Sequence, residues 1–221
     1  MRFRNLSILW FLAFAALPIL HAADSGPKTI VVLGDSLAAG YGVELDEAYP
    51  ALLQKKITDA GWPDNVVNAG VSGDTSSDGL ARIDWVLKQK VDVLLLELGG
   101  NDGLRGIPVD VTRRNLLEII ERTRAKYPGV RIILAGMRMP PNVGQRYGDS
   151  FAQMFPELAR TSRAELVPFL LEGVGGKTGL GLNQADGIHP TGAGHRMVAE
   201  NVWKVLRPVL EKLHAESSRS P

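Results

Sequence analysis

Four short polar clusters contain the residues of this sequence that are best able to do chemistry. They are Gly34-Asp35-Ser36-Leu37, Asn68–Thr75, Gly99-Gly100-Asn101-Asp102 and Asp186-Gly187-Ile188-His189-Pro190. The first cluster holds a serine, the third holds an asparagine amide, and the fourth holds a carboxylate three residues before an imidazole. A hydroxyl, an oriented base and amide donors are the parts from which serine hydrolases are built.

Ser36 follows the apolar run Thr29–Leu33, where a buried strand is expected to turn into a helix. Gly34 permits a tight turn, which would expose the Ser36 hydroxyl at the edge of the sheet. The N–H of Ser36 would then lie at or near a helix N-terminus, where developing negative charge is favoured. The motif is not the G-x-S-x-G elbow of α/β-hydrolases. The competing interpretation is that Asp35 or Ser36 only caps the helix.

The choice of base is narrowed by the small number of histidines, which is four. His21 belongs to the N-terminal segment and His214 to the C-terminal tail. His195 falls inside the predicted last helix, as a packed or surface residue. His189 lies on the preceding loop, where the Asp186 carboxylate can accept from one ring nitrogen and leave the other facing a serine. The alternative is a structural histidine near a helix start.

Stabilisation of an oxyanion is the expected task of the second and third clusters. The side-chain amide of Asn101 is a good donor to an oxyanion, and removing one such donor typically lowers turnover by ~10²–10³. In the second cluster, glycines let backbone amides approach a ligand closely. Each cluster could instead be an ordinary turn, with Asp74 or Thr75 as a helix cap. Asp102 is expected to be structural under either interpretation.

Composition excludes several other classes of protein. The chain has no cysteine, which excludes a cysteine nucleophile, a disulfide and a thiolate zinc site. The formal charge is only +1 and no run of Lys or Arg occurs, so no nucleic-acid partner is expected. Asp186 and His189 could ligate a metal, but a catalytic zinc site normally has three protein ligands. We therefore predict no metal.

The N-terminus has the pattern of a signal peptide. Arg2 and Arg4 form a charged region, Leu6–Leu20 is almost continuously apolar, and Ala22-Ala23 supplies small residues for cleavage. A membrane-spanning helix needs ~20 apolar residues, and a retained anchor is the alternative interpretation. We expect residues 1–23 to be removed, no stable membrane anchor, and a periplasmic or secreted mature protein.

Apolar and amphipathic segments alternate from residue 29 onward. Strands are predicted at Thr29–Leu33, Asn65–Asn68, Val91–Leu98, Arg131–Ala135 and Glu165–Phe169, and helices at Tyr49–Ala60, Ser76–Gln89, Val109–Tyr127, Phe151–Ser162 and Thr191–Leu213. Long loops are expected at Gly136–Gly148 and Gly173–Leu182. The alternation predicts one three-layer α/β/α domain over residues 24–221, with a five-stranded parallel sheet of flavodoxin-like order. Sites in such sheets lie beyond the carboxyl ends of the strands, where three of the clusters fall.

The four clusters, in this order, resemble the motifs of the SGNH or GDSL-type hydrolases, over about residues 30–210. The segments GDSLAAGYG, SGDTSSDGLAR, LELGGNDGLRG and DGIHP look closest to the branch of exported bacterial acyl-CoA thioesterases that also act as proteases and lysophospholipases. The resemblance implies no cofactor, Ser36 as nucleophile, and His189 as base with Asp186 as its orienter. It implies an oxyanion hole made by the N–H groups of Ser36 and Gly73 and the Asn101 amide, with Gly70 as the alternative to Gly73.

The expected function is hydrolysis of acyl esters and thioesters, including acyl-CoA, short-chain and aryl esters and lysophospholipids. We expect the acyl tail to lie along a groove, and the residues predicted to border it are Leu37, Leu104, Met137, Met139, Pro140 and Tyr147. The resemblance also implies a substrate gate at Thr75–Leu80. A monomer with transient lipid contact is expected. The alternatives are a deacetylase of O-acetylated carbohydrate with the same triad and a non-catalytic periplasmic lipid-binding protein.

Overall fold

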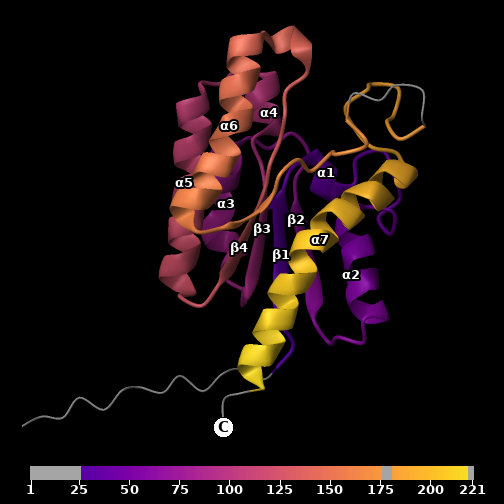
Figure 1. Cartoon of the computed structure of the whole chain (residues 1–221), viewed down its shortest axis with the longest axis vertical. Coiled ribbons are helices and arrows are strands. Elements are labelled where there is room, and N and C mark those ends of the chain that lie inside the picture. The colour runs from indigo at the N-terminus through magenta and orange to yellow at the C-terminus, as the bar shows by residue number, and fades with distance from the viewer. Residues whose placement is uncertain (1–25, 176–180, 219–221) are drawn as a thin grey trace, which may run out of the picture.

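Five parallel strands form the sheet of the computed structural model, which describes residues 26–175 and 181–218 (Figure 1). The strands are β1 (Thr29–Gly34), β2 (Asn65–Gly70), β3 (Val93–Glu97), β4 (Arg131–Ala135) and β5 (Glu165–Val167). Their order across the sheet is β2-β1-β3-β4-β5, which confirms the flavodoxin-like prediction. The predicted signal peptide lies outside the described residues, and so does part of the predicted loop Gly173–Leu182.

Helices cover both faces of this sheet, as the alternation of segments predicts. They are α1 (Ser36–Ala39), α2 (Tyr49–Asp59), α3 (Ser76–Val86), α4 (Gly100–Leu104), α5 (Val109–Lys126), the 3₁₀ helix η1 (Pro141–Val143), α6 (Gln145–Ser162) and α7 (Gly192–Ser217). Helices α2 and α7 pack together on one face, whereas α5 packs between α3 and α6 on the other (Figure 1). In the described part of the chain, none of these helices is both long enough and apolar enough to cross a membrane.

The core lies between the sheet and these two helical layers. Ile30–Leu33 in β1 and Leu94–Leu96 in β3 are fully buried. Both strands are apolar on both faces because helices cover each face, as a parallel sheet requires. Glu97 is the exception within β3, since it is a fully buried acidic residue at the carboxyl end of the strand.

Helix α4 was not predicted, because its sequence contains two glycines, which are poor helix formers. Its packing explains why it forms. A Cβ on Gly103 would lie 2.2 Å from the sulfur of Met139, so glycine lets this side chain cross the helix closely. Asp102 is fully buried and joins α4 to α3 and α5 through bonds to Ser76 and Thr112. Tertiary contacts therefore override local propensity here.

The end of the predicted loop Gly136–Gly148 needs correction. Residues 145–148 are helical, since α6 begins at Gln145 rather than Phe151; Tyr147 anchors this polar first turn by donating to the Ile107 carbonyl at 2.6 Å. Thr75–Leu80, which the resemblance implies as a substrate gate, starts a helix, as predicted for Ser76–Gln89. Thr75 caps α3 through a reciprocal capping box with Asp78, and Ser76 is fully buried. The gate expected at Thr75–Leu80 is therefore the capped first turn of a helix.

Candidate active site

The turn after β1 carries Ser36 at the first position of α1. The Asp35 carboxylate accepts from the Leu37 N–H at 3.0 Å, so Asp35 is the cap of this short helix. Helix α1 ends after one turn at Gly40, whose φ of 76° lies in the left-handed region that glycine tolerates. Capping by Asp35 leaves the Ser36 side chain free to point away from the helix. The capping and the catalytic interpretations of this motif are thus compatible.

Ser36, His189 and Asp186 form a continuous hydrogen-bonded chain. The Ser36 hydroxyl lies 2.9 Å from His189 Nε2, and His189 Nδ1 lies 2.7 Å from Asp186 Oδ2. Both ring nitrogens of the imidazole are therefore engaged, one by the hydroxyl and one by the carboxylate. This is the relative arrangement of hydroxyl, base and orienter that a serine hydrolase requires.

Asp186 is held as an anion. Burial acts to raise the pKa of Asp186, but the hydrogen bond from the His189 ring and the N–H groups of Ile188 and His189 outweigh it and lower the pKa to about 2. The three donors come from one turn of chain, because residue 189 follows residue 186 by three positions. Asp186 can therefore fix the ring orientation of His189 and stabilise its protonated form.

Two neighbours of His189 were not predicted from the sequence. The Tyr41 ring lies 4.6 Å from the His189 ring, measured between centroids. Gln184 donates through its side-chain amide to the Tyr41 carbonyl at 2.7 Å and to the Pro190 carbonyl at 3.0 Å. These bonds tie the loop after α1 to the loop that carries His189. Tyr41 lies within the segment GDSLAAGYG, so the resemblance could have drawn attention to it, whereas no local sequence signal marks Gln184.

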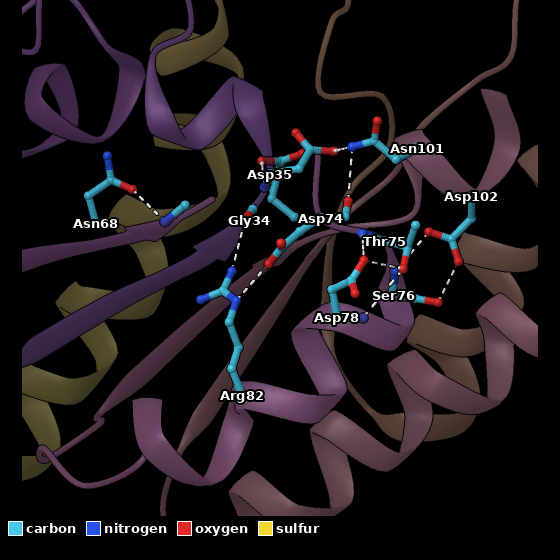
Figure 2. A network of polar contacts seen from close by, with 12 residues as sticks. Gly34, Asp35, Asn68, Asp74, Thr75, Ser76, Asp78, Arg82, Asn101 and Asp102 are labelled. Carbon is cyan, nitrogen blue, oxygen red and sulfur yellow. Dashed lines mark hydrogen bonds and ion pairs between the residues drawn. The ribbon is translucent and has the colours of Figure 1, made fainter. Parts of the chain in front are cut away.

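The predicted oxyanion donors follow the carboxyl ends of the three neighbouring strands β1, β2 and β3. Gly73 has a φ of 90°, and its N–H donates to no other described residue. The Gly70 N–H, by contrast, donates to the Asn68 side chain at 2.9 Å, so Gly70 is less suited to bind an oxyanion. The Asn101 amide donates to the Asp74 carbonyl at 2.9 Å and to Asp35 Oδ2 at 3.2 Å (Figure 2).

Arg82 is a further residue of this region that was not predicted. It extends from α3 and donates to the carbonyl of Gly34 and the carboxylate of Asp74 (Figure 2). A second arginine, Arg105, donates to the Gly73 carbonyl at 3.0 Å. The backbone that carries the predicted oxyanion donors is therefore held by two guanidinium groups. Arg82 lies within the segment SGDTSSDGLAR, and the resemblance to the family pattern could have drawn attention to it.

Asp102 has the structural role expected of it. Its carboxylate accepts from the N–H and the hydroxyl of Ser76 and from the Thr112 hydroxyl. These bonds connect α3, α4 and α5 beneath the site, as Figure 2 shows for Ser76 and Asp102. His195 is likewise a packed residue, as expected: it is buried in α7 and accepts from the Tyr49 N–H at 3.3 Å.

An apolar groove with a volume of about 330 Å³ leads away from the site. Four of the predicted acyl-binding residues line it, and these are Leu104, Met137, Met139 and Pro140. Leu37 and Tyr147 do not line it: Leu37 is buried in the core, and Tyr147 borders a separate hollow between α5 and α6. Lining residues that were not predicted include Arg138, Phe169, Leu171 and Ile188. Phe169 and Leu171 follow the edge strand β5, where the sequence shows only another apolar run.

No group of three or more His, Asp or Glu side chains within residues 26–175 and 181–218 is arranged to hold a metal ion.

Comparison with known proteins agrees with this geometry. Residues 32–197 match the GDSL-like lipase/acylhydrolase family. The chain is 42% identical to esterase TesA of Pseudomonas aeruginosa over 87% of this chain and 94% of that protein. It is 38% identical to thioesterase 1/protease 1/lysophospholipase L1 of Escherichia coli K12 over 95% of this chain and 98% of the relative.

A crystal structure of TesA superposes with a TM-score of 0.78 at 43% identity, covering 82% of this chain and 99% of that one. The chain therefore belongs to the GDSL-like lipase/acylhydrolase family and is a serine hydrolase of small-molecule esters.

Proposed function

We propose that the protein hydrolyses acyl esters and thioesters through an acyl-serine intermediate, with Ser36 as nucleophile, His189 as general base and Asp186 as its orienter. The observation that carries this proposal is the chain of contacts from the Ser36 hydroxyl through His189 to Asp186, with distances of 2.9 Å and 2.7 Å. These distances lie within hydrogen-bond reach, which a nucleophile and its base require.

In the first step the Ser36 oxygen attacks the acyl carbonyl while His189 Nε2 takes the hydroxyl proton. The carbonyl electrons move onto its oxygen, and the resulting oxyanion is stabilised by the N–H groups of Ser36 and Gly73 and by the Asn101 amide. His189 then gives its proton to the departing alcohol or thiol as the bond to the acyl carbon breaks. The Gly73 N–H, which donates to no other described residue, supports this assignment because it is available to a substrate oxygen.

In the second step water replaces the alcohol or thiol. His189 accepts a proton from the water as the water oxygen attacks the acyl-serine carbonyl, and the same donors stabilise the second oxyanion. The proton then passes from His189 to the Ser36 oxygen as the acid leaves. Asp186 remains ionised throughout and stabilises the imidazolium form of His189 in both steps.

The groove supports substrates with an apolar acyl chain. Its lining is formed chiefly by aliphatic, thioether and aromatic side chains, and it begins near the site at Gly100 and Ile188. Burial of each methylene contributes ~0.8 kcal/mol to binding of such a chain. The relatives named as an esterase and as a thioesterase and lysophospholipase support esters, thioesters and lysophospholipids as substrate classes, and within these classes we propose acyl-CoA and short-chain and aryl esters. An O-acetyl sugar would gain little from an apolar groove, and a lipid carrier would need no oriented base.

Two further expectations belong to the same proposal. Residues 1–23 act as a signal peptide that directs residues 24–221, a single domain, to the periplasm or beyond. The support is the charged and apolar pattern of the leader. The mature protein acts as a monomer that meets lipid only transiently; the exposed side chains of Leu104 and Ile188 at the groove support such contact.

Replacement of the nucleophile tests the proposal. Ser36→Ala should lose nearly all hydrolysis of p-nitrophenyl esters and acyl-CoA while unfolding at the same urea concentration as the wild type. A fluorophosphonate probe should label the wild type at Ser36 and leave the variant unlabelled. The matched control is Ser150→Ala, because Ser150 is exposed on α6 outside the acyl groove and should change neither readout. Substantial turnover by Ser36→Ala would disprove the assignment of the nucleophile.

A further inference from the structure

Two acidic side chains are buried directly behind Ser36. Asp35 is 2% exposed and Glu97 is fully buried. They come from neighbouring strands, because Gly34 at the end of β1 is in register with Glu97 at the end of β3. Fully buried acidic residues are rare unless they are paired with a cation or serve a function. Neither carboxyl group forms an ion pair with a described basic residue within 4.0 Å, so this pair needs another explanation.

Glu97 lies against the backbone that carries the nucleophile. Its Oε2 accepts from the Asp35 N–H at 3.2 Å, and a Cβ added to Gly34 would lie only 2.4 Å from the same oxygen. The glycine of the Gly-Asp-Ser motif is therefore needed here to let the Glu97 carboxyl group approach. The other oxygen, Oε1, is buried without a hydrogen-bond partner among the described residues.

The two carboxyl groups cannot both be ionised. Their side chains are both buried and lie close together, since Glu97 Oε2 accepts from the Asp35 N–H at 3.2 Å, and two buried carboxylates so near to each other share one proton because like charges repel. Burial, reinforced by the charge of Asp35, raises the pKa of Glu97 well above its usual range. Burial also raises the pKa of Asp35, to about 6, against the lowering effect of its bonds with Leu37 and Glu97. Glu97 is thus the member that keeps the proton near neutral pH.

Asp35 in turn contacts the predicted oxyanion donor. Its Oδ2 accepts from the Asn101 amide at 3.2 Å, and the Asp74 carbonyl accepts from the same nitrogen at 2.9 Å (Figure 2). The two hydrogens of the amide are thereby used, and the amide plane is fixed. An oxyanion must therefore take over the hydrogen that Asp35 holds. A hydrogen bond from Glu97 withdraws charge from Asp35 and so weakens its competition for that hydrogen.

We propose that Glu97 is a positioning residue that acts as a neutral acid: it donates its proton to Asp35 and so adjusts how firmly Asp35 orients the Asn101 amide. This inference rests on the proposed function, because that function assigns Asn101 to the oxyanion hole. Glu97 acts indirectly, since it affects the Asn101 amide through Asp35 and does not contact the substrate.

Two substitutions at position 97 separate the neutral acid from other roles. Glu97→Gln preserves shape and a hydrogen donor, and it should retain at least a third of the wild-type kcat on a p-nitrophenyl ester. Glu97→Met removes the donor at similar length, and it should lower kcat about 10-fold or more with KM changed less than threefold. The control for loss of a buried polar group is Thr123→Val, since Thr123 is buried in α5 and its hydroxyl bonds, among the described residues, only to the Ile119 carbonyl. It should lower the urea midpoint and leave kcat unchanged.

A double-mutant cycle tests the route through Asn101. Adding Asn101→Ala should cost at least fivefold less in kcat in the Glu97→Met background than in the wild type, because Asp35 already holds the Asn101 amide more firmly there and keeps it from the oxyanion. Infrared spectra at pH 8 add a measurement on the unaltered active site. The wild type should show the carbonyl band of a protonated carboxylic acid, and Glu97→Gln should lack it.

The inference is overturned if Glu97→Gln loses as much kcat as Glu97→Met, if Glu97→Met retains full kcat, if the cycle is additive, or if the infrared band is absent from the wild type. Failure of the proposed function gives a different result, since Ser36→Ala would then remain active. Loss of activity in Ser36→Ala together with wild-type kcat in Glu97→Met would overturn the role of Glu97 alone.

Discussion

The guanidinium group of Arg82 donates through Nε to the carboxylate of Asp74 at 2.7 Å, and both side chains are largely buried, with 21% and 13% of their surfaces exposed. The same guanidinium group donates through Nη2 to the Gly34 carbonyl at 3.0 Å. Asp74 accepts from the Asn101 amide through its main-chain oxygen. Arg82 therefore ties the strand end before Ser36 to the turn that holds the predicted oxyanion donors.

Replacement of Arg82 by lysine should impair turnover more than binding. An ammonium group can reach only one of the two acceptors with the fork geometry that arginine provides, so the Gly34 carbonyl or the Asp74 carboxylate is left unsatisfied. We expect Arg82→Lys to lower kcat about 10-fold with a small change in KM. We also expect a loss of ~1–3 kcal/mol in the free energy of unfolding, measured in urea. The control is Arg122→Lys, because the ion pairs of Arg122 with described residues are those with the exposed carboxylates of Glu118 and Asp84. Wild-type kcat in Arg82→Lys would contradict this role.

Asn101→Ala should reduce turnover by ~10²–10³ while KM changes only a few-fold, because an oxyanion donor acts in the transition state and not on the ground-state ester. Steady-state kinetics on an aryl ester and on an acyl-CoA measure both constants. Asn115→Ala is the control, since the Asn115 amide bonds to Ser76 and Ser77 and does not reach Asp35. An unchanged kcat in Asn101→Ala would remove this amide from the oxyanion hole.

The sheet and its long helices could be predicted from sequence because their signals are local. Val91–Leu98 is apolar over a length typical of a covered strand, and Val109–Tyr127 has apolar residues at helical spacing with Pro128-Gly129 to end it. The structure has β3 and α5 within these bounds. Helix α4 has no such local signal. It is stabilised by contacts with distant residues, namely Met139, Ser76 and Thr112, and a local sequence pattern does not reveal these contacts.

The site was predictable to the extent that each member stands in a recognisable cluster. Ser36, Asn101 and His189 follow glycine-rich patterns at strand ends or before the last helix, and the structure brings Ser36 and His189 into contact. Gln184 carries no such pattern, and although Tyr41 lies within GDSLAAGYG, its place beside His189 follows only after two distant loops fold together. Leu37, in contrast, was predicted to line the acyl groove and does not. Its position next to Ser36 in the sequence suggested the groove, but in α1 its side chain is buried in the core.

The acyl groove makes a prediction about chain length. Leu104 lines the groove with 44% of its surface exposed, so an aspartate there places a charge beside the acyl chain at little cost in stability. Leu104→Asp should lower kcat/KM for a long-chain p-nitrophenyl ester about 10-fold more than for the acetate, since a chain of several methylenes loses ~1–3 kcal/mol of contact. Leu45→Asp is the control, because Leu45 is 77% exposed outside the groove. Equal losses for the long and short esters would show that the acyl chain lies elsewhere.

His195 makes a prediction about stability and pH. Nδ1 of His195 accepts from the Tyr49 N–H, so the ring hydrogen lies on Nε2, which is buried without a partner among the described residues. Burial lowers the pKa of His195 to about 4, with a smaller contribution from the charge of His189. An unfolded histidine takes up its proton near pH 6.5, so between these values the unfolded chain binds more protons than the folded one. The contribution of His195 to stability is therefore present above about pH 6.5 and is lost as the pH falls toward 4.

This loss is best measured as a difference between the wild type and His195→Gln, which keeps an acceptor and does not titrate. The raised pKa values of Asp35 and Glu97 have the opposite effect on stability, because as the pH falls the folded protein binds protons at these groups before the unfolded protein does. This effect is the same in the wild type and in His195→Gln, so it cancels in the difference. From pH 7 to pH 4, urea unfolding should show the wild type losing on the order of 3 kcal/mol relative to His195→Gln, which corresponds to a pKa lowered from 6.5 to about 4. A pH-independent difference between the two proteins would mean that the folded chain accommodates a protonated His195.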